Sequence, residues 1–159
     1  MGTIDLDRDN AVRPRRRSPH EGAPPPPLPG AEVDWRDQAA FSEAVPTPEI
    51  LAFAEALLRQ EGLAPEGAPV LLRHRPGDRG LPADQGQGLR FALDLTGSRS
   101  SLLGGALVFF DDTGRGAGWR AETGALTVWS GPDPDLTELV PGAPERLTLI
   151  GRARELVDH

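Results

Sequence analysis

The sequence lacks cysteine and lysine entirely, and it holds only three histidines in 159 residues. Without cysteine there can be no disulfide framework, no thiolate zinc site and no cysteine nucleophile. Positive charge is also scarce, because 17 arginines stand against 24 acidic residues and the net charge is −7. Proteins that neutralise many phosphates carry net positive surfaces, so we expect no nucleic-acid partner.

Long apolar runs are missing as well. The stretch from Ala106 to Phe110 is one of the longest, far below the roughly 20 residues that a membrane span needs. Basic residues near the N-terminus are not followed by an apolar segment, so a secretory signal is not indicated. We therefore expect a cytoplasmic protein without a membrane partner, and the length suggests one domain.

The first 31 residues differ from the rest in composition. They contain a basic run at 13–17 and a proline-rich block at 24–29, and nothing in them can form a packed core. A polyproline II ligand with a basic flank is one interpretation, and a solvated, disordered tail is the other, which we favour. The predicted organisation is a disordered Pro/Arg-rich tail over 1–31 and a folded domain over 32–159.

One helix is predicted between Thr47 and Gly62. Thr47 can cap the free amides, Pro48 suits the first turn, and Gly62 can close the end. Apolar residues recur at helical spacing between these signals, so one side of the helix must pack on something. A sheet is the available partner.

After Gly62 the sequence changes to short apolar runs separated by glycine, proline and aspartate, which is typical of an all-β sandwich or barrel. Phe109 and Phe110 are adjacent, so in a regular strand they must point to opposite faces. Trp119 and Trp129 could line a ligand pocket, but aromatic residues on short strands are more often core, and we favour core. The predicted strands are Val70–His74, Leu89–Thr96, Ala106–Phe110, Gly118–Ala121, Ala125–Trp129, Leu136–Val140 and Arg146–Arg152.

Five motifs of this β region, taken in order, resemble those of a known family. They are Arg73–Asp78, similar to a Tyr-x-x-Gly-Asp segment; Leu89–Thr96, similar to the strand after the first metal ligands; Gly104–Phe110, similar to a Gly-Gly-x-Leu strand; Trp119–Trp129, similar to a Pro-x-x-Gly-x-Leu pattern; and Arg146–Thr148, similar to an Arg-x-Ser/Thr strand. The order resembles that of the prolyl-hydroxylase-like 2-oxoglutarate/iron(II) oxygenases. The resemblance implies a mainly β fold, a double-stranded β-helix of the jelly-roll or cupin type, with one N-terminal helix packed on the sheet.

The resemblance also implies where an iron(II) ion would be held, by two histidines and one carboxylate. The family's His-x-Asp motif and distal histidine fall on Ala83, Gln85 and Asp135, and none of the three has the expected residue type. Asp84 and Asp133 lie beside these positions, and oxygen ligands alone would suit magnesium or calcium. In a chain with 24 acidic residues we favour the other interpretation, that they are loop acids facing water.

The histidine inventory leads to the same expectation without any alignment. His20 lies in the proposed tail, His159 is the last residue, and only His74 lies well inside the domain. Two converging imidazoles are therefore not expected, and we predict that no metal site is intact.

Arg146 is the residue most suggestive of a retained role. In the family the matching arginine binds the distal carboxylate of 2-oxoglutarate, assisted by a hydroxyl two residues on, where this sequence has Thr148. Residues two apart on a strand face the same side, and a guanidinium with a hydroxyl can hold a carboxylate. His74, at a tyrosine position of the family, could donate a third hydrogen bond. The alternative, that Arg146 is a surface or ion-paired strand residue, has equal weight.

These observations predict a degenerate member of the 2-oxoglutarate/iron(II) oxygenase superfamily that acts as a non-catalytic binding or scaffolding module. Its partner would be another protein or an active homologue, with a dicarboxylate at Arg146 as a retained ligand. We expect no cofactor in this case, although 2-oxoglutarate stays a candidate. The alternative is an active 2-oxoglutarate-dependent dioxygenase with unusual or partner-supplied iron ligands, and only then would Fe(II) be a cofactor. A third interpretation, a Pro-rich adaptor, predicts that removal of residues 1–31 abolishes partner capture.

Overall fold

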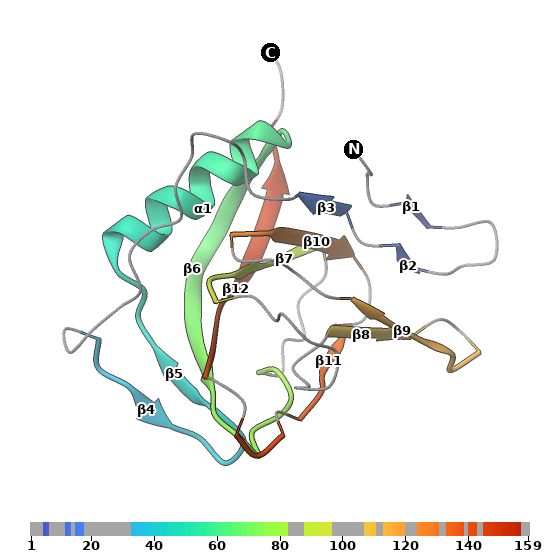
Figure 1. The fold of residues 1–159 in the computed structure, drawn as a ribbon. Helices are drawn as coiled ribbons and strands as arrows, with labels where there is room; N and C mark the ends of the chain where they lie inside the picture. Colours follow the sequence, from blue (N-terminus) through green and yellow to red (C-terminus); the bar gives the residue numbers. More distant parts are fainter. Residues whose placement is uncertain are drawn as a thin grey trace.

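Two antiparallel sheets pack face to face, and one helix covers the outside of the larger sheet (Figure 1). The computed structural model describes residues 33–82, 88–96, 107–110, 113–119, 124–130, 133–138, 140–142 and 145–156, together with the backbone of three short strands before residue 18. All of the strand pairs are antiparallel. In the described part of the chain, mainly β structure with one helix confirms the predicted fold class.

The larger sheet has seven strands in the order β3-β10-β7-β12-β6-β5-β4. The smaller sheet has the order β11-β8-β9, and β1 pairs with β2 separately. The strands are β1 (Asp5–Leu6), β2 (Val12–Arg13), β3 (Arg15–Arg17), β4 (Arg36–Asp37), β5 (Ser42–Ala44), β6 (Leu63–His74), β7 (Leu89–Asp94), β8 (Leu107–Phe110), β9 (Gly116–Trp119), β10 (Leu126–Ser130), β11 (Asp135–Leu136) and β12 (Arg146–Glu155).

The helix α1 (Pro48–Gln60) begins and ends where its capping residues predict. The Thr47 side chain accepts a hydrogen bond from the Ile50 N–H, and Gly62 follows the last turn with a φ of 73°. Its buried residues Ile50, Ala54, Leu57 and Leu58 form the apolar side that packs on the larger sheet. The predicted helix is confirmed.

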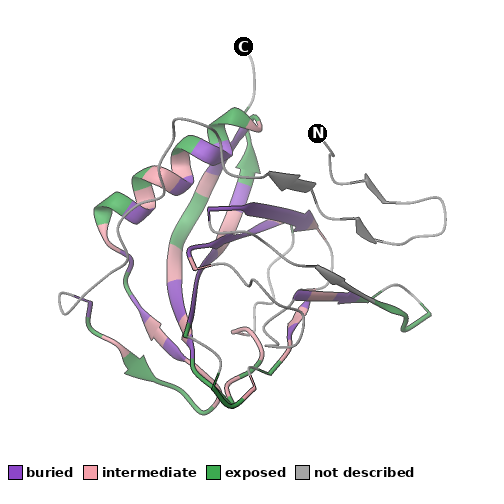
Figure 2. Ribbon diagram, in the orientation of Figure 1, coloured by how far each residue is buried: buried purple, intermediate pink, exposed green. Residues whose placement is uncertain are grey.

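The larger sheet buries both of its faces, and the two faces belong to different clusters. Its outer face packs on α1 through residues such as Leu71, Leu93 and Leu149. Its inner face, which carries Leu72, Ala92, Trp129 and Ile150, packs against Leu107, Phe109 and Leu136 of the smaller sheet. Figure 2 accordingly shows β7 and β10 buried along most of their length. This arrangement is consistent with a jelly-roll fold whose described inner-face residues pack together.

Strand β6 is longer than the sequence predicts, because it begins at Leu63 rather than Val70. The strand continues through Pro65, Gly67 and Pro69 by bulging, with a φ of 75° at Gly67 and a register shift against β12 between Ile150 and Arg152. The other strands of the β region occur where predicted with shifted ends, and β11 is shortened to two residues. Residues 120–121 of the predicted strand Gly118–Ala121 lie outside the described residues.

Within residues 1–31 the structure describes the backbone of three short strands, and the predicted disorder of this tail stays a prediction. Arg15–Arg17 pairs antiparallel with Leu126–Val128 of β10. Edge strands offer unpaired backbone N–H and C=O groups that accept a neighbour almost irrespective of its side chains, so a pattern of side chains does not reveal this pairing.

Candidate ligand site on the inner face of the barrel

Four polar residues gather at one end of the inner face. Arg146 on β12 lies opposite His74 on β6, and Thr148 lies opposite Asp94 on β7. All four are buried. Partners in antiparallel strands point to the same face, so the structure brings together the three predicted ligand residues, Arg146, Thr148 and His74, and adds Asp94 to them.

The Arg146 guanidinium binds the Asp94 carboxylate directly. The Nη2–Oδ2 distance is 2.6 Å, and the exposed fractions of the two side chains are 4% and 2%. The Nε of Arg146 also lies 3.5 Å from the Thr148 hydroxyl, at the limit of a hydrogen bond. A charge-assisted contact of this length is strong, and removing one buried partner would leave the other charge uncompensated.

Asp94 is held in place by the surrounding backbone. Its second carboxylate oxygen, Oδ1, accepts a hydrogen bond from the Thr96 N–H at 3.1 Å. Its backbone N–H donates to the Ala125 carbonyl, and its backbone carbonyl accepts from the Gly124 N–H. The Thr96 hydroxyl in turn accepts from the Leu147 N–H, beside Arg146. The carboxylate that faces Arg146 is therefore positioned by the strand and by the turn after it.

His74 lies on the other side of Arg146 and is fully buried. Its Nε2 makes a 2.8 Å hydrogen bond with the Gly80 carbonyl, which requires the tautomer with a proton on Nε2. Its Nδ1 has no hydrogen-bond partner among the described residues. Burial lowers the pKa of His74, and the Arg146 charge lowers it further, whereas the Gly80 hydrogen bond and Asp78 oppose the shift. A neutral imidazole therefore lies beside the guanidinium.

Apolar side chains of the described residues pack together between the two sheets. Trp129 is fully buried, and its ring packs edge-on against Phe109 at 5.6 Å between centroids. The Trp129 Nε1–H donates to Asp133, which also lies 3.6 Å from the Arg90 guanidinium. Phe110, the neighbour of Phe109, is half-exposed, which confirms that the pair points to opposite faces. Trp129 is core as predicted, and the side chain of Trp119 lies outside the described residues.

Of the three positions that match the family's metal ligands, only Asp135 is described, because Ala83 and Gln85 fall in the gap 83–87. Asp135 pairs with Val108 on β8, while its neighbour Leu136 packs into the barrel interior. Successive residues of a strand point to opposite faces, so Asp135 points away from the interior, and its carboxylate lies 3.9 Å from the Arg79 guanidinium. Over the described part of the chain, no group of three His, Cys, Asp or Glu side chains could hold a metal ion.

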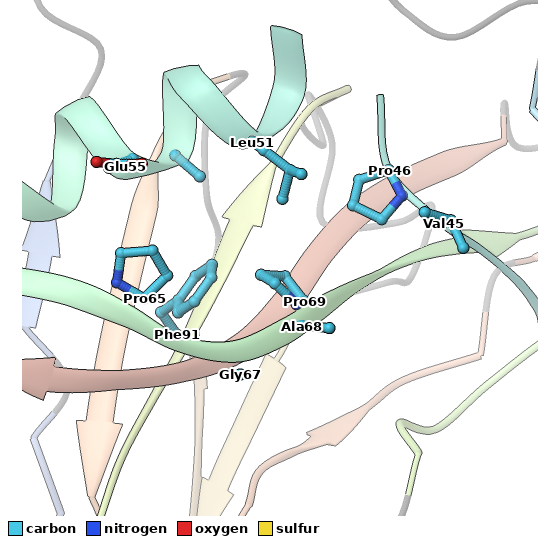
Figure 3. A pocket seen from close by; sticks show the side chains of 10 residues that line it. Val45, Pro46, Leu51, Glu55, Pro65, Gly67, Ala68, Pro69 and Phe91 are labelled. Atoms are coloured by element: carbon cyan, nitrogen blue, oxygen red, sulfur yellow. The ribbon is translucent and has the colours of Figure 1, made fainter. Parts of the chain in front are cut away.

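A separate apolar hollow of about 300 Å³ opens between α1 and the bulge of β6 (Figure 3). Leu51 and Ala54 of the helix form one wall, and Pro65, Pro69 and the Phe91 ring form the other. Among its described lining residues Glu55 is the only charged one, and it binds Arg59 at 2.9 Å. The described lining of the hollow is therefore largely apolar and brings no acid, base and nucleophile together.

Asp94 is the residue of this site that sequence reasoning missed. Its signal was present, because a carboxylate stands inside the apolar run 91–95, where a buried charge needs a partner. The run does not say which of 17 arginines supplies that partner, and Arg146 lies 52 residues away along the chain.

Two packed antiparallel sheets with a helix on the outer face are consistent with the double-stranded β-helix class. The crystal structure of a Pseudomonas putida prolyl-4-hydroxylase matches the chain with a TM-score of 0.51 and 20% sequence identity, covering 78% of each chain. No protein-family model matches the sequence, and no curated protein does. The likeness establishes a prolyl-hydroxylase-like fold, and activity has to be argued from the site. In the described residues no helix is long and apolar enough to cross a membrane.

Proposed function

We propose that the chain is a non-catalytic binding or scaffolding module built on the fold of the 2-oxoglutarate/iron(II) oxygenases. The observation that carries the proposal is the state of Arg146, whose guanidinium is bound by the chain's own Asp94 at 2.6 Å in a fully buried pair. The side chains available to bind a metal support the same proposal. His74 is the one imidazole of the described residues, and its Nε2 is engaged by a backbone carbonyl. These residues do not fit an iron(II) centre, which needs two imidazoles and a carboxylate on one face.

The partner of such a module would be another protein or an active homologue of the same fold. Cytoplasmic location belongs to the same proposal, and fractionation of cells that produce the full chain would check it.

Metal binding and turnover test the proposal. Equilibrium dialysis against manganese(II), a redox-stable substitute for iron(II), is expected to show no stoichiometric binding. Incubation with iron(II), 2-oxoglutarate and ascorbate is expected to form no succinate above the iron-free control. Stoichiometric binding accompanied by iron-dependent succinate formation would refute a non-catalytic role.

A second candidate is an active 2-oxoglutarate-dependent dioxygenase with unusual or partner-supplied iron ligands. It is favoured by the placement of Arg146, Thr148 and His74 on one face of one barrel end. Under this candidate Arg146 would bind the distal carboxylate of 2-oxoglutarate. The second candidate then predicts that Arg146→Ala abolishes 2-oxoglutarate binding measured by calorimetry. Arg154→Ala is the control and should leave binding unchanged, because Arg154 is an exposed arginine of the same strand. Equal affinity of the wild type and the Arg146→Ala variant excludes this role of Arg146.

A further inference from the structure

We infer that residues 75–82 form a strap that fastens one end of the two packed sheets, and that this strap opens when His74 takes up a proton. The strap follows the end of β6 directly and reaches β11 of the smaller sheet (Figure 1). The inference concerns how this end of the fold opens. It applies to a catalytic and to a non-catalytic protein alike, so it does not depend on the proposed function.

Gly80 is the residue through which the strap contacts both sheets. Its carbonyl accepts the 2.8 Å hydrogen bond from Nε2 of His74 on the larger sheet. Its N–H donates to the carbonyl of Leu136 on the smaller sheet, also at 2.8 Å. The φ of Gly80 is 81°, a conformation that glycine adopts more readily than other residues. A movement of the His74 ring away from Gly80 therefore breaks one of the two links that this residue makes.

The strap also shields the His74 ring from water. Leu81 of the strap packs against the apolar cluster between the sheets. Phe41, from the turn between β4 and β5, lies 5.6 Å from the imidazole between ring centroids. His74 is fully buried in this arrangement. The imidazole reaches water only when the strap or its neighbours move.

The closed strap leaves no favourable place for a second proton on His74. That proton would go onto Nδ1, which has no hydrogen-bond partner among the described residues. The ring would then carry a positive charge opposite Arg146 on β12, while the carboxylate of Asp94 on β7 binds that arginine. Burial lowers the pKa of His74, and the Arg146 charge lowers it further, against the opposing effects of the Gly80 hydrogen bond and of Asp78.

The acidic groups of the strap and of β11 are engaged with arginines. Asp78 accepts a 2.9 Å hydrogen bond from the Arg75 N–H, and its carboxylate lies 3.8 Å from Nε of the same residue. Asp135 on β11 lies 3.9 Å from the Arg79 guanidinium and points away from the interior. The described surroundings therefore favour a neutral His74 while the strap is closed. In the open strap the ring is in water and takes up a proton near pH 6.5.

This difference in proton binding drives the opening. Above about pH 6.5 neither form binds the second proton, and the closed strap has its full stability. Below that pH the open form takes up a proton that the closed form excludes, so the opening constant rises up to tenfold per pH unit until the closed ring itself titrates. Between about pH 7.5 and about pH 4.5 the expected rise is therefore up to about 100-fold.

Amide hydrogen exchange of the full chain, measured by mass spectrometry and corrected for the pH dependence of the chemical exchange step, tests the inference. Peptides covering the strap report on the Gly80 N–H, and peptides covering α1 report on the domain as a whole. Strap protection is expected to fall by up to about 100-fold over this pH range, while α1 stays protected. His74→Gln is the matched variant, because its amide can donate to the Gly80 carbonyl and does not titrate. Its strap protection should be the same at both pH values.

Three outcomes overturn the inference. The first is strap protection in the wild type that does not change with pH. The second is an equal loss of protection in His74→Gln, which would assign the effect to another group. The third is a loss at α1 in step with the strap, which would mean that the whole domain unfolds.

If His74→Gln does not fold, the imidazole signal of wild-type His74 is followed by NMR instead. It has to titrate over the pH range in which the strap loses protection, and titration in a different range overturns the inference. The presence or absence of metal binding and of succinate formation changes none of these results.

Discussion

Breaking the buried Arg146–Asp94 pair from one side is expected to cost more than removing it from both sides. Arg146→Met leaves the Asp94 carboxylate in a place where its side chain is 2% exposed. Breaking a buried ion pair by removing one partner costs about 3–5 kcal/mol. For a protein of this length that corresponds to a fall of roughly 6–20 °C in the midpoint of thermal unfolding.

Replacing both partners removes the uncompensated charge. The double variant Arg146→Met with Asp94→Leu keeps an apolar group on each side, and methionine is smaller than arginine and leaves room for leucine. The remaining losses include the hydrogen bond from the Thr96 N–H, the weak contact between Arg146 and the Thr148 hydroxyl, and the packing error, together about 2–3 kcal/mol. The double variant should therefore be more stable than either single variant.

Urea unfolding followed by tryptophan fluorescence measures these values, because Trp129 is fully buried in the folded protein. An unchanged dependence on urea concentration shows that the variants differ in stability and not in the compactness of their states. The exposed pair Arg59–Glu55 is the control, and its double-mutant cycle should give a coupling below about 1 kcal/mol. If the losses of Arg146→Met and Asp94→Leu simply add in the double variant, the two charges are not coupled and the reasoning is refuted.

Three further predictions concern the pH dependence, the bulge and the helix cap. The pKa of His74 is lowered in the folded state, so the unfolded chain binds a proton on this imidazole at a higher pH than the folded chain does. The free energy of unfolding should therefore fall by up to about 1.4 kcal/mol per pH unit as the pH drops below about 6.5. The difference in unfolding free energy between the wild type and His74→Gln, measured at each pH, isolates this slope. If the two proteins lose stability in parallel as the pH falls, the prediction is contradicted. Gly151→Ala should cost about 1–3 kcal/mol in urea unfolding, because the new Cβ would lie 2.9 Å from the Phe91 ring, and less in a Phe91→Leu background. In urea unfolding, Thr47→Ala should cost about 1 kcal/mol and Thr47→Ser much less, because the hydroxyl caps α1. Equal losses in the two variants would argue against the cap.

The elements that the sequence predicts well are those fixed by local chemistry. The helix is bounded by a capping threonine and a closing glycine, and both act within one turn of the helix end. Strands such as β7 and β10 are recognisable because apolar runs end at glycine and aspartate. In these cases the residues that decide the structure are neighbours in the chain.

The first half of β6 shows where local chemistry misleads. Pro65 and Pro69 remove two backbone donors, and Gly67 needs a positive φ, all of which argue for a loop. The strand forms nonetheless, because β12 pairs with it over nine residue pairs and takes up the irregularity as a bulge. Gly151 stands at that bulge and allows the Phe91 ring to approach the backbone. Pairing between segments about 80 residues apart overrides the local signals.

The candidate site was predictable in part for a related reason. The two-residue spacing of Arg146 and Thr148 fixes their common face from the sequence alone. His74 joins them because β6 and β12 pair in a register that places it opposite Arg146. The role of Asp94 depends on the pairing of β7 with β12, and no local pattern reveals that pairing.

A buried arginine at position 146 is compatible with two different roles, in ligand binding and in a structural ion pair. An arginine at this position is required by a ligand carboxylate in a protein that binds one, but it is required equally by Asp94 in a protein that does not. Loss of Arg146 alone would be costly in both cases, since each leaves a buried carboxylate without its cation. The presence of Arg146 therefore does not distinguish a working ligand site from a structural ion pair. The feature that distinguishes this chain is Asp94, whose carboxylate lies 2.6 Å from Nη2 of that guanidinium and is itself held by the Thr96 N–H, so a ligand carboxylate at this nitrogen would have to displace an anchored side chain.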